Sequence, residues 1–318
     1  MMPILERDPW RLQYFEGVDC PEDVVVPTDD PDCWHLYPKH RWVYNKLYIA
    51  ESQGVACGPH GVTPQRFPVF SKPIFNLKGM GVGSEAVCNA EQLASGYQPG
   101  HFWMELFRGD HVSTDCAVVR GEVKWLRHTS GVPGDGGTFK YWTVEATPRS
   151  ALTAKITSWV KEHMAGYTGM MNFESIGGGL IEAHLRFADQ WCDLYGAGWV
   201  EALVRLYARG EWEFKEQHRN AGYSIPLFAE HGEAFSHPAA EVQARIRAMP
   251  GIASLQITFH DASEGAYHAM PPGGFRLGVI NAINLNAGLK ARDVLARAFP
   301  GVEMLDASHR AEIPLEVA

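Results

Sequence analysis

Short runs in which apolar and polar residues alternate predict that much of this chain forms β-strands. The region 102–125 alternates over the length of two strands, with a turn at Arg120 and Gly121 between them. Similar runs predict further strands at 67–74, 139–144, 254–259 and 275–280. We therefore expect a sheet-rich protein built from many short strands.

Apolar residues at helical spacing occur between these strands. Residues 150–164 place apolar side chains every three or four positions, after an expected N-cap at Thr147 with Pro148 behind it, and Gly166 follows as a stop signal. Further helices are expected at 40–53, before Gly210, after Pro238 and at 287–299. Because helices and strands mingle throughout, we predict an α+β fold, with α/β as the alternative.

Breaks in this pattern divide the chain into three parts. Residues 1–38 are rich in Asp and Pro and contain one short apolar run, so they form a short N-terminal segment. Residues 39–210 hold most of the predicted strands and helices and form the core. Residues 211–318 are expected to form a smaller α/β lobe.

Composition excludes several classes of protein. The net charge of −9 repels nucleic acid and anionic membranes at long range, so neither is expected as a partner. No stretch approaches the roughly 20 apolar residues of a membrane span, and the N-terminus lacks the pattern of a signal peptide. The six cysteines are scattered without metal-binding spacing, which is typical of reduced thiols. We expect a cytoplasmic protein.

The most informative segment is a predicted hairpin around three consecutive glycines, residues 177–179. Side chains of a strand alternate between its two faces. A three-residue loop at these glycines would therefore place Glu174 opposite Glu182 and Asn172 opposite His184. A bulge could shift this pairing but would keep the polar side chains clustered.

Two glutamates at close range repel each other unless a cation or a shared proton joins them. Arg186 supplies some positive charge, and a divalent metal would supply more, because Mg²⁺ favours carboxylate and phosphate oxygens. The alternative is a solvated polar face with Glu–Arg pairs. The hairpin alone leaves both interpretations open.

A glycine-rich turn at residues 79–84 gives a second, independent signal. Glycines let the backbone approach phosphates, and Lys72 on the preceding predicted strand can neutralise them. The spacing is not that of a P-loop. A second glycine-rich stretch, 131–137, is either a loop over a substrate or a plain hairpin connection, and we favour the connection.

Taken in order, these segments resemble the ATP-grasp superfamily, and most closely its glycinamide ribonucleotide synthetase and carboxylate-amine ligase branch. Residues 180–189 (LIEAHLRFAD) resemble the carboxylate strand of that branch. Residues 67–74 are similar to its lysine strand, 79–84 to the flexible loop over ATP, 104–109 to the linker that reads adenine and ribose, and 272–279 to the closing lobe. The resemblance implies two α+β lobes that enclose a nucleotide, with a shortened N-terminal domain.

The resemblance also implies a role for particular residues. Lys46 and Lys72 would contact the phosphates of ATP, and Glu105 would lie at the adenine or ribose end. His111 stands where the family commonly has a ribose-binding glutamate. The full set expected to bind the cofactor is Lys46, Lys72, Gly79, Gly81, Gly83, Ser84, Glu105 and His111.

Metal binding and catalysis are implied at the hairpin. Glu182 would bind Mg²⁺, with Glu174 and His184 as further ligands. His184 replaces the usual asparagine ligand, which favours Mn²⁺ as an alternative metal. Arg186 would face the transferred phosphoryl group or the substrate, and Lys72 and Arg186 are the expected catalytic residues.

The implied activity is an ADP-forming ligase. A carboxylate would be activated as an acyl phosphate and then captured by an amine or a related nucleophile. Two alternatives stay open, namely an ATP-grasp phosphotransferase and a non-catalytic protein that binds a nucleotide or a partner. The identities of the carboxylate and the amine are not specified by the sequence. The oligomeric state also stays open, with a homodimer as one candidate.

Overall fold

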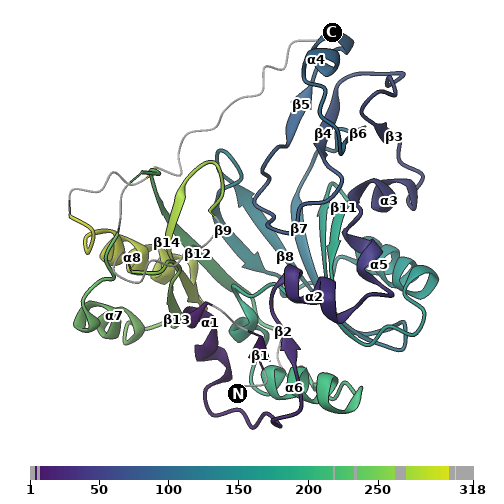
Figure 1. Cartoon of the computed structure of the whole chain (residues 1–318). Helices are drawn as coiled ribbons and strands as arrows, with labels where there is room; N and C mark the ends of the chain where they lie inside the picture. Colours follow the sequence, from purple (N-terminus) through teal and green to yellow (C-terminus); the bar gives the residue numbers. More distant parts are fainter. Residues whose placement is uncertain are drawn as a thin grey trace.

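The computed structural model describes residues 4–5, 8–217, 219–232, 235–261, 270–300 and 305. An eight-stranded sheet in the order β11-β10-β7-β8-β9-β12-β14-β13 runs through these residues, and all its neighbouring strands are antiparallel. Figure 1 shows it as the broad layer in the middle of the molecule. Its strands are β7 (His111–Val119), β8 (Glu122–Pro133), β9 (Phe139–Val144), β10 (Gly169–Ile176), β11 (Gly179–His184), β12 (Gly222–Ala229), β13 (Ile252–Ile257) and β14 (Phe275–Ala282).

A four-stranded sheet, β3-β6-β4-β5, forms a small lobe at the β7–β11 end of the large sheet (Figure 1). Its core contains Val69, Val87, Leu93 and Trp103. A third sheet pairs two short strands of the N-terminal segment in parallel. The strands of these two sheets are β1 (Ile4–Leu5), β2 (Val26–Pro27), β3 (Cys57–Pro59), β4 (Val69–Pro73), β5 (Glu85–Val87) and β6 (His101–Glu105).

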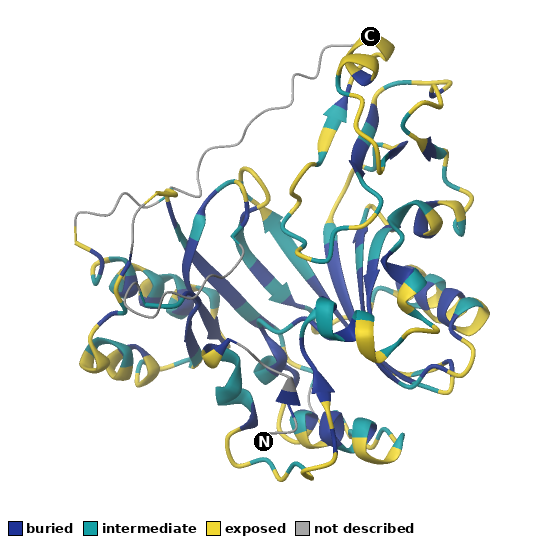
Figure 2. Ribbon diagram, viewed as in Figure 1, coloured by how far each residue is buried: buried dark blue, intermediate teal, exposed yellow. Residues whose placement is uncertain are grey.

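The central strands of the large sheet are largely buried (Figure 2). In β7 the seven inner residues are all buried, and the strand reads as a continuous rather than an alternating pattern. The helices are α1 (Pro9–Leu12), α2 (Asp30–Leu36), α3 (Lys46–Glu51), α4 (Ala90–Ser95), α5 (Ser150–His163), α6 (Trp199–Arg209), α7 (Ala240–Arg247) and α8 (Leu285–Ala296), with short 3₁₀ turns η1 (Gln13–Phe15), η2 (Arg41–Tyr44) and η3 (Cys192–Tyr195).

The predicted turn at Arg120 and Gly121 is confirmed, since both residues adopt a left-handed conformation between β7 and β8. The prediction of two strands over 102–125 is wrong, because β6 at its start belongs to the small sheet. The residues after β6 leave one lobe and enter the other. Alternation alone cannot distinguish one sheet from the next.

The long helix α5 begins at Ser150, three residues after the expected N-cap Thr147. Arg149, the residue before the helix, forms ion pairs with Glu145 and Asp110, and the helix starts after it. The stop signal at Gly210 is confirmed, since that residue caps α6 in a left-handed conformation.

The C-terminal strands extend the central sheet instead of forming a sheet of their own. β12 pairs with β9 on one side and β14 on the other, so the sheet continues across the boundary expected near residue 210. This part still has its own core, in which α7 and α8 pack against β12, β13 and β14. Within the described residues, no helix is long and apolar enough to cross a membrane.

Candidate functional site

A cavity of about 420 Å³ lies between the small lobe and the large sheet. Its floor crosses the large sheet from one end toward the other. The floor residues, in strand order, are Glu182 on β11, Glu174 on β10, His111 on β7, Phe139 and Trp142 on β9, Phe228 on β12 and Arg276 on β14. The small lobe supplies Phe70, Lys72 and Met104. The cavity therefore joins a charged end at β10 and β11 to a largely apolar end at β9 and β12.

The predicted pairing of the two glutamates is confirmed. Glu174 lies opposite Glu182, and Asn172 lies opposite His184. The turn is shorter than expected, because only Gly177 and Gly178 lie between the paired ends of the strands. A bulge next to Glu174 offsets this difference and restores the register.

The glycines of this hairpin also make room for the linker between β6 and β7. A Cβ on Gly177 would lie 2.1 Å from the carbonyl oxygen of Arg108, and the residue has a φ of +55°. A Cβ on Gly179 would lie 2.3 Å from the ring of Phe107. The hairpin and the linker thus touch backbone to backbone, which places Phe107 on the cavity wall.

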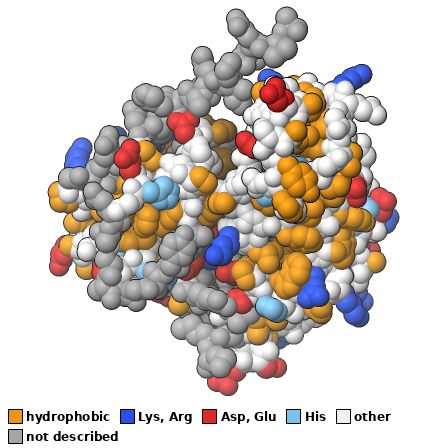
Figure 3. Space-filling model, turned by 45° about the horizontal axis from the view of Figure 1, so that its top comes forward, with side chains coloured by type: hydrophobic (Ala, Val, Ile, Leu, Met, Phe, Trp, Pro, Cys, Tyr) orange, Lys and Arg blue, Asp and Glu red, His pale blue; other side chains and the backbone are white. Residues whose placement is uncertain are grey.

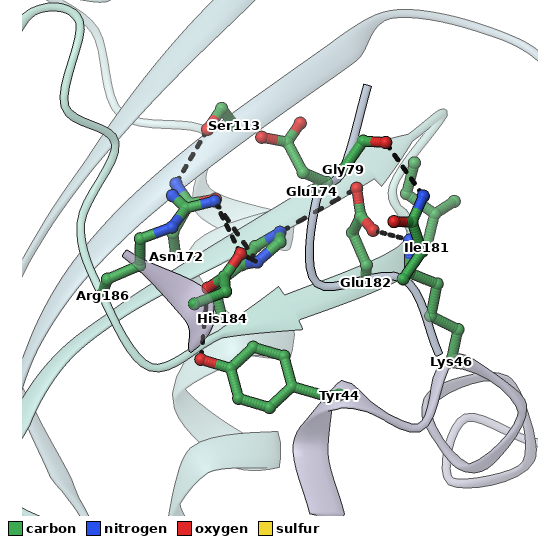
Figure 4. Close-up of polar contacts among 12 residues, drawn as sticks. Tyr44, Lys46, Gly79, Ser113, Asn172, Glu174, Ile181, Glu182, His184 and Arg186 are labelled. Carbon is green, nitrogen blue, oxygen red and sulfur yellow. Dashed lines mark hydrogen bonds and ion pairs between the residues drawn. The ribbon is translucent and has the colours of Figure 1, made fainter. Parts of the chain in front are cut away.

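Two lysines meet the carboxylate strand at the charged end. Lys46 is the first residue of α3, and the preceding Asn45 caps this helix by accepting a hydrogen bond from the Tyr48 amide. The ammonium group of Lys46 pairs with Glu182 (Figure 4). Burial alone would raise the pKa of Glu182, but Lys46 holds it well below its ordinary value, so Glu182 is ionised.

Lys72 projects from β4 and is almost completely buried. Its Nζ donates a hydrogen bond to the carbonyl oxygen of Ile181 at 2.7 Å. Burial lowers the pKa of Lys72 to about 7, an effect that Glu182 opposes and Lys46 reinforces. An anion bound beside Lys72 would favour its charged form, because opposite charges at short range stabilise each other.

The second glutamate is paired with a histidine. Nε2 of His111 lies 2.7 Å from a carboxylate oxygen of Glu174. Burial alone would lower the pKa of His111, whereas the hydrogen bond and the charge of Glu174 raise it. The ring also meets Phe139 and Trp142 edge-on, with centroids 5.1 and 5.6 Å away. His111 therefore stands between the charged and apolar ends of the cavity.

A buried network continues from the charged end along the carboxylate strand, where Nε2 of His184 lies 3.9 Å from Glu182 (Figure 4). Nδ1 of His184 lies 2.8 Å from Asp30, whose carboxylate also accepts hydrogen bonds from Arg186 at 3.0 Å and Tyr44 at 3.1 Å. Burial would lower the pKa of His184, but Asp30 raises it to about 9. The pKa of Asp30 falls to about 2 despite burial, because Arg186 and His184 are close.

The cavity brings together eight of the predicted site residues, namely Lys46, Lys72, Gly81, Ser84, Glu105, His111, Glu174 and Glu182. Gly79, Gly83, His184 and Arg186 are not part of its wall. His184 and Arg186 point instead toward Asp30. Sequence reasoning missed Asp30, because its partners on β11 lie about 150 positions away and an Asp-Pro segment reads as a polar loop.

The chemistry of the donor set fits a hard divalent cation. Two carboxylates face one cavity from adjacent strands, and carboxylate oxygens are the protein ligands that Mg²⁺ prefers. Among the described residues, no cluster of three or more His, Cys, Asp and Glu side chains is arranged to hold a metal. His184 carries a proton in its pairing with Asp30, so its role as a ligand stays a prediction.

The glycine-rich stretch 131–137 is a hairpin connection, as favoured from the sequence. It connects β8 and β9, and Pro133, Gly134 and Gly137 line the cavity. The carbonyl oxygen of Gly136 accepts a hydrogen bond from the amide of Gly273 at 2.7 Å. This connection therefore ties the segment before β14 to the cavity rim.

Neither a protein-family model nor a curated protein sequence matches the chain, whereas solved structures do. An L-amino acid ligase from Bacillus licheniformis superposes with a TM-score of 0.62 and 11% identity, over 93% of this chain and 84% of that one. A phosphoribosylamine–glycine ligase from Thermotoga maritima gives 0.57 and 13%, over 92% and 87%. A carboxyaminoimidazole ribonucleotide synthase from Aspergillus clavatus, solved with ATP, gives 0.58 and 14%, over 87% and 82%. The chain has the ATP-grasp fold.

The ATP-grasp fold confirms the predicted architecture of two α+β lobes with a C-terminal α/β part. The small sheet and the hairpin both line the cavity. On the face drawn in Figure 3, the visible basic side chains stand singly or in small groups between acidic and apolar ones.

Proposed function

We propose that this chain is an ATP- and divalent-metal-dependent ligase, which activates a carboxylate as an acyl phosphate for attack by an amine or related nucleophile and releases ADP. The observation that carries this proposal is the convergence of Lys46, Lys72, Glu174 and Glu182 in one cavity between two lobes. Two cations and two anions at one end suit a polyphosphate with its metal. The ATP-grasp fold of the chain supports the same reading.

The two lysines would neutralise phosphate charge from two different elements of the fold. Lys46 comes from the start of α3 and Lys72 from β4, and both lie beside β11. Because they are largely buried, their charges are poorly screened and act strongly on a bound anion. Glu182 holds Lys46 in place before any ligand arrives.

Glu174 and Glu182 would hold Mg²⁺ or Mn²⁺, which would supply positive charge at the phosphates when bound. Each glutamate has a side-chain partner in the structure, Glu174 the imidazole of His111 and Glu182 the ammonium group of Lys46. Both carboxylates are thereby kept apart and oriented toward the cavity. Arg186, anchored by Asp30, would fix the base of the strand that carries Glu182.

A general capture assay tests this proposal without knowledge of the natural amine. The protein is incubated with ATP, Mg²⁺ and hydroxylamine, together with panels of carboxylic acids and amino acids. An acyl phosphate is captured as a hydroxamate, so hydroxamate and ADP should appear together and depend on the acid. Glu182→Gln should lose this activity, whereas Glu162→Gln, at an exposed position on α5, should retain it.

Two results would contradict the proposal. A stable phosphorylated product without hydroxamate would identify a phosphotransferase instead. Binding of ATP without turnover across the panel would indicate a non-catalytic nucleotide-binding protein. Undiminished activity in Glu182→Gln would refute the assignment of Glu182 to the metal site but not the ligase activity.

A further inference from the structure

Arg276 is a buried cation that forms no ion pair with the residues that the structure describes. Its side chain is 5% exposed and lines the cavity from β14. Within the described part of the chain, its only side-chain hydrogen bond runs from Nε to Thr258 Oγ1 at 3.3 Å, and it forms no salt bridge. The two terminal nitrogens are therefore left for a ligand.

The acidic residue that acts most strongly on Arg276 is already engaged elsewhere. Burial lowers the pKa of Arg276, and Asp189 opposes this effect through its charge. Asp189 itself pairs with Arg11. A buried guanidinium without a partner is costly, and an anionic ligand with two oxygens would match its planar pair of N–H donors.

The surface beside Arg276 is apolar and aromatic. Phe228 is its direct neighbour across β12 and β14, so both side chains stand on the same face of the sheet. Phe139 and Trp142 continue this wall, with ring centroids 4.0 Å apart, and Trp191 supports Trp142 from behind at 5.1 Å. Pro226 and Pro271 complete the surface.

The two ends of the cavity thus differ in the ligand that they fit. The lysines and glutamates lie at the β10 and β11 end, while Arg276 lies at the β14 end beyond the aromatic wall. A single cation beside a broad apolar surface is a poor match for a polyphosphate and a good match for a small acid with an apolar body.

We propose that this half of the cavity binds a carboxylic acid with an aromatic or similarly large apolar body, with the carboxylate on Arg276 and the body against Phe139, Trp142 and Phe228. The inference rests on the proposed function and deepens it, because it names the class of acidic substrate that the ligase would take. Arg276 would recognise the charge of the acid, and the aromatic wall would recognise the size of its apolar body.

The test uses three small probes on the whole protein, with and without ADP and Mg²⁺. 3-Phenylpropionate has the charge and the ring, 3-phenylpropanamide has the same shape without the charge, and acetate has the charge without the ring. Calorimetric titration should show the acid binding at least about tenfold more tightly than its amide, as expected for a charge-assisted hydrogen-bond pair. Acetate should bind more weakly than the aromatic acid.

Three variants assign this preference to residues. Arg276→Gln should lose the preference for the acid over the amide, while Arg245→Gln, an exposed arginine on α7, should keep it. Phe228→Ala should weaken the binding of 3-phenylpropionate but leave the acid bound more tightly than the amide. If Arg276→Gln does not fold, the proposal is still tested by the Phe228 variant and by the ratio of the wild-type affinities for the acid and the amide.

Other outcomes separate this inference from the proposed function. Equal binding of acid and amide, or an Arg276→Gln variant that keeps the preference, would overturn the acid site. A wild type that binds ATP with Mg²⁺ but none of the probes would overturn the acid site and leave the ligase proposal standing. A wild type that binds the acid as predicted but forms no complex with ATP would overturn the ligase and keep the site.

Discussion

Replacing Asp30 with Asn should change how the stability of this protein depends on pH. Asp30 joins three side chains beside the carboxylate strand, namely His184, Arg186 and Tyr44. Asn keeps the shape but removes the negative charge. The buried His184 and the partly buried Arg186 then lose their counter-ion, and breaking one buried pair typically costs about 3–5 kcal/mol of stability.

The size of the pH effect follows from His184. Burial alone would lower its pKa, but Asp30 raises it from 6.5 to about 9 in the folded protein. A raised folded-state pKa stabilises the protein fully below pH 6.5, and this stabilisation is lost as the pH rises through 9. At about 1.4 kcal/mol for each pH unit, the loss is about 3 kcal/mol.

Asp30 contributes at the acidic end with the opposite sign. Its pKa is lowered to about 2, so its stabilisation is present above about pH 4 and is lost as the pH falls through 2. Lys72 has its folded-state pKa lowered by burial from 10.5 to about 7, so it destabilises the folded state fully below pH 7, and this cost declines as the pH rises toward 10.5. Because Lys72 is common to wild type and variant, their difference isolates the Asp30 network.

The measurement is the free energy of unfolding by urea at several pH values between 6 and 9.5. The gap between wild type and Asp30→Asn should narrow by about 3 kcal/mol over this range. Asp23→Asn, at an exposed position in the same N-terminal segment, should show no such narrowing. A gap that stays constant with pH would refute the assignment of a charged His184 held by Asp30.

Three further predictions concern the cavity and its hairpin. Lys72→Met should make the unliganded protein more stable at pH 6 than the wild type, with a smaller gain at pH 9, because the charged amine is desolvated only in the folded state. Urea unfolding at both pH values measures this difference, and a variant less stable than the wild type at pH 6 would contradict the prediction. Gly178→Ala should cost about 1–2 kcal/mol of stability, because Gly178 is left-handed, and Gly177→Ala should cost more, because Gly177 is left-handed and also touches Arg108. Equal melting temperatures of the two variants would contradict the close packing of hairpin and linker. Chelation of divalent metal with EDTA should remove the stabilisation by ATP, and a shift that survives EDTA would speak against metal ligation by Glu174 and Glu182.

The hairpin shows what the sequence alone can predict. Three glycines between two extended runs gave the pairing of Glu174 with Glu182, because strand periodicity leaves few registers that keep the polar side chains together. The register is nevertheless reached through a shorter turn and a bulge. These two differences cancel, and nothing in the residue pattern indicates either of them.

The network around Asp30 shows where prediction from sequence stops. Its members come from α2, η2, β11 and the residues just after β11, and only the folded chain brings them together. The aromatic wall was missed for a different reason. Phe139 and Trp142 occupy a strand that reads as ordinary core, and only the geometry shows that their surface also lines a cavity.

The most direct test of the central claim is the thermal stability of wild type and Lys72→Met with ATP, in the presence and absence of Mg²⁺ or Mn²⁺. A ligand that binds only the native state stabilises it by about 2.7 kcal/mol at a hundredfold excess over its dissociation constant. The account predicts a metal-dependent rise in melting temperature for the wild type and for the surface control Lys124→Met, and none for Lys72→Met. A wild type whose melting temperature responds to no nucleotide with either metal would contradict it.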